Sequence, residues 1–276
     1  MISGRNLIAI SFASLMASAG LPSAAQALSN LVPHRAVYNL ELKDSAEKSG
    51  ITSMNGRMVY EFTGSECEGY KVNFRFVTQS DVGGEKRVSD QQSMTFEDTR
   101  AGRFEFESKS YTDERLDKEV QGHAEDLKDK LTVELMEPSE KQVELQPGRF
   151  PTEHMLELIK RARSGEHFFE ARVFDGSDNG DKTVYTTTIV GTPVGVLPGD
   201  PDADSAGKLK TEKTWPVTIA YFNDDEKVDG LPTYRMSFKL YENGVSRDLT
   251  MDYGDFALTG RLVKLDFLPE TTCLPH

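Results

Sequence analysis

Metal ligands are scarce in this chain of 276 residues. It contains two cysteines and five histidines, and no pair of histidines has the spacing of an HxH or HExxH metal motif. A structural zinc site needs four ligands, usually cysteine and histidine, and the sequence contains no cluster of that kind. We therefore expect no metal and no cofactor.

Catalytic motifs are also missing. The sequence has no GxSxG nucleophile elbow and no glycine-rich phosphate loop, and GSDNG at residues 176–180 has its serine in the wrong place. We interpret the adjacent Glu153 and His154 as an ordinary exposed first turn of a helix rather than a catalytic pair. We expect a protein that is not an enzyme, and an unrecognised hydrolase is an alternative without a motif.

Basic residues and long apolar runs are in short supply. Lysine and arginine number 32 against 45 aspartates and glutamates, which gives a net charge of −13. Such a surface repels phosphate backbones and anionic headgroups, so we expect no nucleic acid partner. No segment after residue 27 has the run of about 20 apolar residues that crosses a bilayer, and we expect no integral membrane segment.

The first 27 residues have the organisation of a secretory signal peptide. Arg5 precedes an apolar stretch at residues 7–19, Pro22 follows, and Ala25-Gln26-Ala27 forms an A-x-A cleavage site. We expect export and cleavage after about Ala27, with an anchor helix that stays attached as the alternative. Export favours a disulfide over two free thiols for the two cysteines.

Most of the remaining chain alternates apolar and polar residues with a period of two, which is typical of half-buried strands. In one such run Tyr70, Val72, Phe74 and Phe76 share a face. We expect a dozen or more strands. Turn signals such as Gly83-Gly84 and Asn243-Gly244 separate many of them, so the sequence predicts antiparallel hairpins.

One segment, residues 151–163, predicts a helix. Thr152 is suited to the N-cap and Gly165 to the stop. The apolar stripe that defines the helix consists of Met155, Leu158, Ile159 and Ala162. Near the other end of the chain, the apolar face of a strand switches between Leu262 and Val263, which predicts a β-bulge or a strand that passes between two packed surfaces.

A single helix cannot cover the apolar faces of so many strands. We therefore predict a mainly β fold in which a long antiparallel sheet curls into a spiral or open barrel, although periodicity alone also allows a sandwich. Residues 192–207, rich in Pro, Gly and Asp, are expected to form a surface loop within one domain that spans residues 28–276.

The acidic stretch FDGSDNGDK allows two interpretations. Asp175, Ser177, Asn179 and Gly180 match the first half of a calcium loop, but Thr186 stands where such a loop has glutamate. A hairpin turn stabilised by Asp and Asn side chains is the favoured interpretation.

Inward-facing aromatic residues are either plain core or part of a ligand site. Strand parity points several of them to the interior of the predicted sheet, and the single tryptophan stands at the start of a strand. The candidate ligand-facing residues are Phe74, Phe76, Phe104, Phe106 and Trp215.

Four stretches, VPHRAVYNLEL, SECEGYKV, FDGSDNGDKTVYTTTIVG and LPETTCLP, together resemble the EipB family of periplasmic envelope-integrity proteins of Alphaproteobacteria. The resemblance covers essentially the whole chain after residue 27. It implies a β-spiral related in shape to periplasmic lipoprotein carriers, a role in envelope integrity without an established activity, and a disulfide that carries over to Cys67 and Cys273. Such a bridge is expected to pin the end of the meander to its beginning and hold the curled sheet closed.

Two functions then compete. One is a periplasmic protein that binds a hydrophobic envelope component, a lipid, an acyl chain or a lipoprotein, inside the curled sheet. The alternative is an interaction scaffold with a filled core that contacts other periplasmic envelope proteins. The first is favoured because a sheet of this length with one helix is hard to fill completely.

Overall fold

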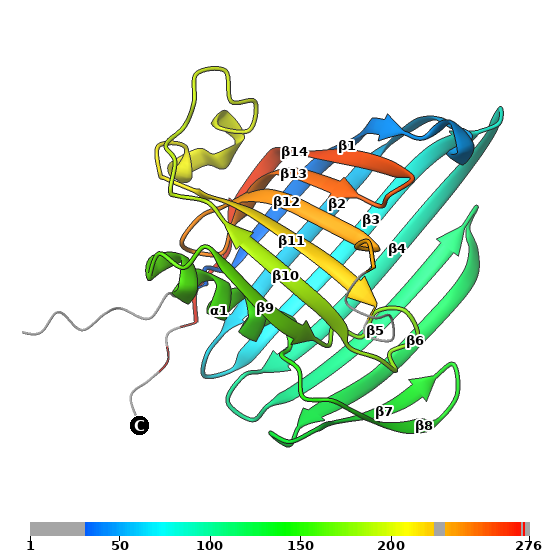
Figure 1. Ribbon diagram of the computed structural model, residues 1–276, viewed down its shortest axis with the longest axis vertical. Coiled ribbons are helices and arrows are strands. Elements are labelled where there is room, and N and C mark those ends of the chain that lie inside the picture. Colours follow the sequence, from blue (N-terminus) through cyan, green and yellow to red (C-terminus); the bar gives the residue numbers. More distant parts are fainter. Residues whose placement is uncertain (1–30, 224–229, 272, 274–276) are drawn as a thin grey trace, which may run out of the picture.

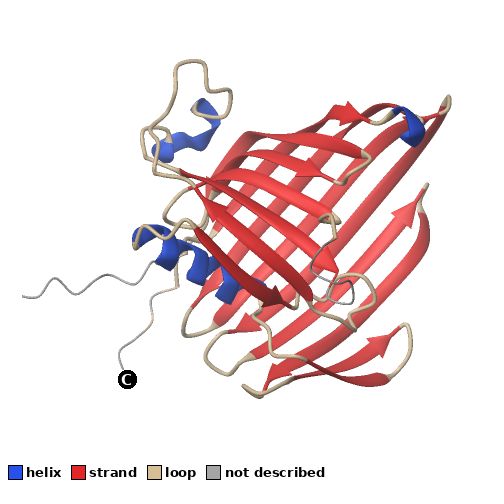
Figure 2. Cartoon of the chain, viewed as in Figure 1, coloured by secondary structure: helices blue, strands red, loops and turns tan. Residues whose placement is uncertain are grey.

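A single antiparallel sheet dominates the computed structural model, which describes residues 31–223, 230–271 and Cys273 (Figures 1 and 2). The signal peptide prediction falls outside these residues. The strands are β1 (His34–Ser45), β2 (Ile51–Ser65), β3 (Gly69–Val82), β4 (Glu85–Asp98), β5 (Arg103–Thr112), β6 (Arg115–Asp126), β7 (Leu131–Glu137), β8 (Lys141–Leu145), β9 (Phe168–Val173), β10 (Val184–Val190), β11 (Trp215–Asn223), β12 (Tyr234–Leu240), β13 (Ser246–Asp252) and β14 (Phe256–Phe267). The helical elements are α1 (Pro151–Arg163) and the short 3-10 helices η1 (Glu47–Ser49) and η2 (Asp204–Leu209).

The strand order places the start of the chain in the middle of the sheet. Strands β1 to β8 follow one another to one edge, and β14 to β9 run from β1 to the other edge. The sheet curls so that β9 to β12 cross in front of β2 to β5, with α1 at one end (Figure 1). The prediction of a curled antiparallel sheet with one principal helix is confirmed.

Helix α1 links the two edge strands, since it follows β8 and precedes β9. Its predicted range is confirmed, and Leu158, Ile159 and Ala162 are buried. Its end is also as predicted, because Gly165 adopts φ +76°, a left-handed conformation that glycine takes without strain.

The prediction that Thr152 caps α1 is wrong. Phe150 occupies the N-cap position, and Thr152 lies in the first turn. The backbone N–H groups of Thr152 and Glu153 donate to the two carboxylate oxygens of Glu97, at 2.7 and 2.8 Å. The cap therefore comes from β4, and a carboxylate there suits both the free N–H groups and the positive end of the helix dipole.

The buried side chains form two hydrophobic clusters. The first lies between the layers of the curled sheet and includes α1. The second lies under β5 to β8, where Phe104 stacks on Phe150 at 5.1 Å between ring centroids and Phe106 meets the edge of Phe174 at 5.5 Å.

A β-bulge stands at the predicted place in β14. Lys264 pairs with Val37 and Leu262 pairs with Tyr38, so Val263 is the extra residue. The bulge explains why the apolar residues change parity there.

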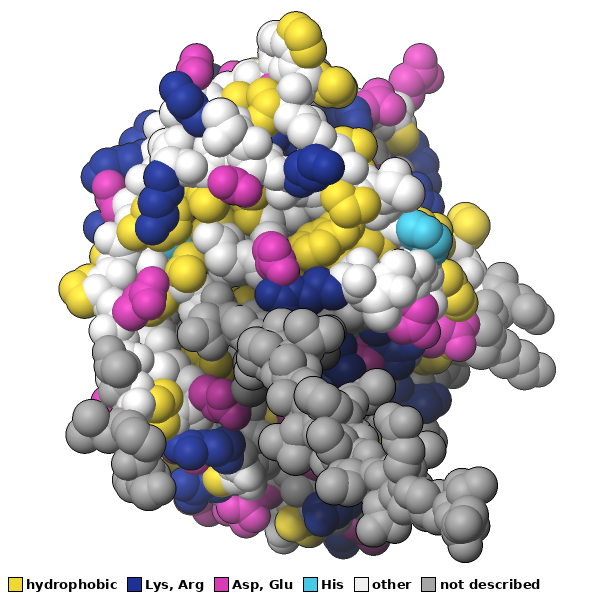
Figure 3. Space-filling model, turned by 90° about the vertical axis from the view of Figure 1, so that its left-hand side faces the viewer, with side chains coloured by type: hydrophobic (Ala, Val, Ile, Leu, Met, Phe, Trp, Pro, Cys, Tyr) yellow, Lys and Arg dark blue, Asp and Glu magenta, His cyan; other side chains and the backbone are white. Residues whose placement is uncertain are grey.

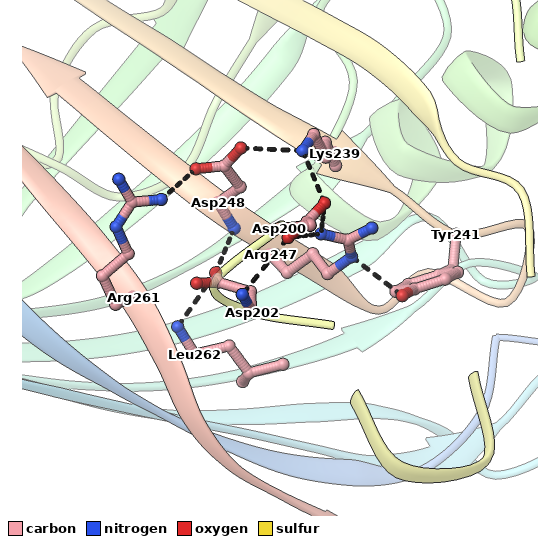
Figure 4. A network of polar contacts seen from close by, with 8 residues as sticks. All are labelled: Asp200, Asp202, Lys239, Tyr241, Arg247, Asp248, Arg261 and Leu262. Atoms are coloured by element: carbon pink, nitrogen blue, oxygen red, sulfur yellow. Dashed lines mark hydrogen bonds and ion pairs between the residues drawn. The ribbon is translucent and has the colours of Figure 1, made fainter. Parts of the chain in front are cut away.

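The segment from residue 192 to 214 is more than the surface loop that its composition predicts. It contains η2, and Asp202 and Ala206 are fully buried. The Asp202 carboxylate accepts hydrogen bonds from the backbone N–H groups of Asp248 (2.7 Å) and Leu262 (3.1 Å) (Figure 4). Leu262 lies beside the β14 bulge, and Asp248 is a residue of β13 with φ +54°. The loop therefore supplies hydrogen-bond acceptors where the pairing of these strands is irregular.

Charged side chains fix the same loop to β12 and β13 (Figure 4). The Asp200 carboxylate lies 2.7 Å from Nη1 of the fully buried Arg247 and 2.8 Å from Nζ of Lys239. Burial raises the pKa of Asp200, but hydrogen bonds from Arg247 and Lys239 outweigh it and lower the pKa to about 2. The carboxylate is therefore ionised at neutral pH and neutralises the buried guanidinium.

Cys67 and Cys273 form the disulfide that the family resemblance implies. The prediction that this disulfide holds the curled sheet closed is wrong. Strand β14 already pairs with β1, and the edges of the sheet are β8 and β9. The bridge instead ties the tail after β14 to the turn between β2 and β3. Of the helices in the described part of the chain, none is long and apolar enough to cross a membrane.

Candidate functional site

A cavity of about 300 Å³ lies inside the curled sheet, against the first turns of α1. Both layers contribute to its wall, from β1 to β3 on one side and from β11 to β13 on the other. Apolar residues on the wall include Met58, Val72, Phe74, Leu158, Ile219, Met236 and Phe238. Figure 3 views the molecule from the end that carries α1, where hydrophobic side chains and charges of both signs are intermixed outside the grey region.

A larger hollow of about 610 Å³ lies over β3 to β7. Arg103, Glu105 and Glu107 line it, and Met94 and Met136 are more than two-fifths exposed there. Charges of both signs on an open surface favour no single class of ligand. The internal cavity is the better candidate, because binding sites for small molecules are mostly apolar with a few placed polar groups.

The candidate aromatic residues lie in different places. Phe74 lines the cavity, and its ligand-facing role stays a prediction. Phe76 is buried in the first cluster, and Trp215 is buried there at the start of β11. Phe104 and Phe106 are packed in the second cluster, because strand order brings them under β7 and β8.

Two histidines on the cavity wall were missed by sequence reasoning. The expectation that His154 is exposed is wrong, since it is 7% exposed and lines the cavity from α1. Burial, followed by the nearby Arg149, lowers the pKa of His154 to about 4. His34, 3% exposed at the start of β1, also lines the cavity, and burial lowers its pKa. Both imidazoles are therefore neutral at neutral pH.

Glu97 fixes the part of the cavity wall that is formed by the first turn of α1. It is 2% exposed and holds the first turn of α1, whose Pro151, Thr152 and His154 face the cavity. Burial raises the pKa of Glu97 to about 7, although the hydrogen bonds from α1 oppose this. Chain position gives no sign of this contact, because the strand and the helix are separated by β5 to β8.

The stretch FDGSDNGDK forms a turn between β9 and β10. The Asp175 carboxylate accepts a hydrogen bond from the Ser177 N–H at 2.9 Å, and the Gly180 N–H donates to the Ser177 carbonyl at 2.8 Å. These are the contacts of the favoured hairpin interpretation. Asp175 also lines the cavity. Over the described ranges, no group of three His, Cys, Asp or Glu side chains is placed to hold a metal ion.

Comparison with known proteins matches residues 25–269 to the model of the EipB-like family. The chain belongs to this family. It is 51% identical over 249 residues to the cell envelope integrity protein EipB of Brucella abortus (strain 2308). The alignment covers 90% of this chain and 88% of that protein.

A solved structure agrees with the fold. The crystal structure of a β-barrel-like protein from Brucella abortus, described as a domain of unknown function, superimposes with a TM-score of 0.84. The two chains are 49% identical, and the match covers 87% of this chain and 100% of that one.

Proposed function

We propose that this protein is a periplasmic, non-enzymatic protein that supports the integrity of the cell envelope by binding a hydrophobic envelope component in its internal cavity. The name of the Brucella relative supports the envelope role. The disulfide supports an oxidising compartment such as the periplasm, since such bonds are rare in the cytosol.

The cavity is the observation that carries the binding part of the proposal. Its volume of about 300 Å³ lies at the lower end of the range for small-molecule sites, which is about 300–1,000 Å³. Most of the residues on its wall are apolar, so water in this space makes few hydrogen bonds with the wall. An apolar ligand would remove this wall and its own surface from water, at about 0.8 kcal/mol per buried methylene. The alternative function, a scaffold with a filled core, does not account for this space.

Native mass spectrometry of protein released from the periplasm without detergent tests the proposal. We expect a reproducible mass addition that is extracted into organic solvent, as a bound lipid or acyl compound would be. A chain that is always empty, and that retains a protein partner instead, would contradict binding and support the scaffold.

A further inference from the structure

We infer that the cavity selects ligands with one short apolar chain and a single head group that donates a hydrogen bond and carries no negative charge, such as a hydroxyl or an amide, with His34 as the acceptor. This inference rests on the proposed function, since it names the class of ligand for the same cavity. It follows from three features of the wall: unpartnered polar atoms, a defined tautomer and limited volume.

The first feature is a pair of imidazoles with free ring nitrogens. His34 and His154 are each more than nine-tenths buried, and Nε2 of His154 has no hydrogen-bond partner among the described residues. The one hydrogen bond that His34 makes within the described residues joins Nδ1 to the Val32 carbonyl. A buried polar group without a partner costs about 1–3 kcal/mol, and a polar group on a ligand would remove that cost.

The second feature is the tautomer of His34. Its Nδ1 lies 2.8 Å from the carbonyl oxygen of Val32. A carbonyl only accepts hydrogen bonds, so Nδ1 carries the proton and the neutral ring leaves Nε2 as an acceptor. Such an acceptor pairs with a hydroxyl or amide N–H of the ligand, whereas a carboxylate or phosphate dianion has no proton to offer.

The wall also disfavours anionic heads. The ring centroids of Tyr60 and His34 lie 5.7 Å apart, and burial keeps the Tyr60 phenol neutral by raising its pKa. Asp175 is the acidic side chain on the described wall, and its Oδ1 already accepts the Ser177 N–H. An anionic head would lose its hydration without gaining a counterion, because no lysine or arginine of the described residues lines the cavity, and this costs several kcal/mol. An ammonium head would have Asp175 as a counterion, so the wall does not exclude it.

The third feature is size. A water molecule occupies about 30 Å³ in the liquid, and a methylene is of similar volume. A cavity of about 300 Å³ therefore holds about ten heavy atoms. This space holds one medium-length chain with its head group, and the second chain of a diacyl lipid would lie outside it.

A series of eight-carbon compounds at pH 7.5 tests the inference. The measurement is displacement of the apolar fluorescent probe naphthalene, a ten-carbon molecule that matches the cavity in size, by 1-octanol, octanamide and octanoate. We expect 1-octanol and octanamide to bind at least tenfold more tightly than octanoate. Equal or tighter binding of octanoate would overturn the inference but leave the proposed function standing. If neither the probe nor any of the three compounds binds, the proposed function itself fails.

Histidine variants assign the head-group contact. In His34→Phe the affinity for 1-octanol should fall about tenfold while the probe still binds, because the acceptor is lost and the apolar wall is kept. His154→Phe provides a second cavity variant if the first does not fold. His167→Phe is the matched control, since His167 is exposed and bonds the Val190 carbonyl outside the cavity. Unchanged 1-octanol affinity in folded His34→Phe would contradict the assignment of His34.

Discussion

Glu97 shows how one residue can join elements that the sequence keeps apart. Its carboxylate on β4 takes the place of an N-cap for α1, and burial raises its pKa to about 7 from an ordinary value of 4.5. Because the folded protein holds this proton more tightly than the unfolded chain, the stabilising contribution is complete below pH 4.5 and is lost as the pH rises through 7.

The first prediction concerns the pH dependence of stability. Between pH 5 and pH 8, the free energy of unfolding of the wild type should fall by about 2–3 kcal/mol relative to Glu97→Gln, whose side chain does not titrate. Urea unfolding at several pH values measures this difference. Glu105→Gln, at an exposed position of β5, should follow the wild type, and parallel curves for wild type and Glu97→Gln would refute the assignment.

A second prediction at the residue scale concerns Gly176. It has φ +70°, and a Cβ atom there would lie 2.5 Å from the Phe106 ring. Gly176→Ala should lower the free energy of unfolding by about 2–4 kcal/mol, through backbone strain and overlap together. Gly199→Ala shares the positive φ, but its Cβ would meet no described atom within 4 Å, so it should lose only about 1 kcal/mol. Equal losses would show that the approach to Phe106 is unimportant.

At the scale of elements, patterns carried by the chain itself were predicted and contacts between distant segments were not. Helix α1 could be placed because its apolar stripe repeats with the helical period, and the β14 bulge because parity switches at Val263. The cap of α1 could not be predicted, because only the curling of the sheet brings Glu97 to the start of the helix. The buried face of the loop before β11 was hidden for the same reason, since the partners of Asp202 lie on β13 and β14.

Asp202→Ala tests how the loop is fixed to the sheet. The substitution leaves the buried N–H of Leu262 and the partly buried N–H of Asp248 without acceptors, which should cost about 2–4 kcal/mol of unfolding free energy. Amide hydrogen exchange of Asp248 and Leu262 should accelerate in particular. Asp204→Ala changes an exposed carboxylate two residues away, and it should leave both amides protected. Protection that persists in Asp202→Ala would mean that other acceptors hold the loop.

At the scale of the whole molecule, the class of fold was predictable because one helix cannot cover so many alternating strands. The strand order was not, since hairpin signals do not show that β14 returns to β1. That return decides which residues meet at the cavity: His34 on β1 and Phe238 on β12 face the same space. The cavity wall was therefore predicted only at Phe74, whose strand parity pointed inward.

The disulfide should stabilise the molecule without shaping it. It joins residues 206 positions apart, and the chain-entropy estimate for such a loop is about 5 kcal/mol. Cys273→Ser should therefore lower the melting temperature by about 10 °C or more, while circular dichroism at 25 °C stays that of the wild type because β14 still pairs with β1. Dithiothreitol should lower the melting temperature of the wild type by the same amount. It should leave the melting temperature of the double variant Cys67→Ser, Cys273→Ser unchanged. An unaltered melt in both cases would show that the bridge contributes no stability.

The central claim is that the space inside the curled sheet is a binding site. A titration of naphthalene into the wild type and two variants of one strand tests it most directly. Val72 lines the cavity, and Val77 points to the other face of β3, since side chains alternate along a strand. We predict that Val72→Trp weakens probe binding at least tenfold while Val77→Trp binds as the wild type does, with all three proteins folded. Wild-type affinity in a folded Val72→Trp protein would contradict the claim.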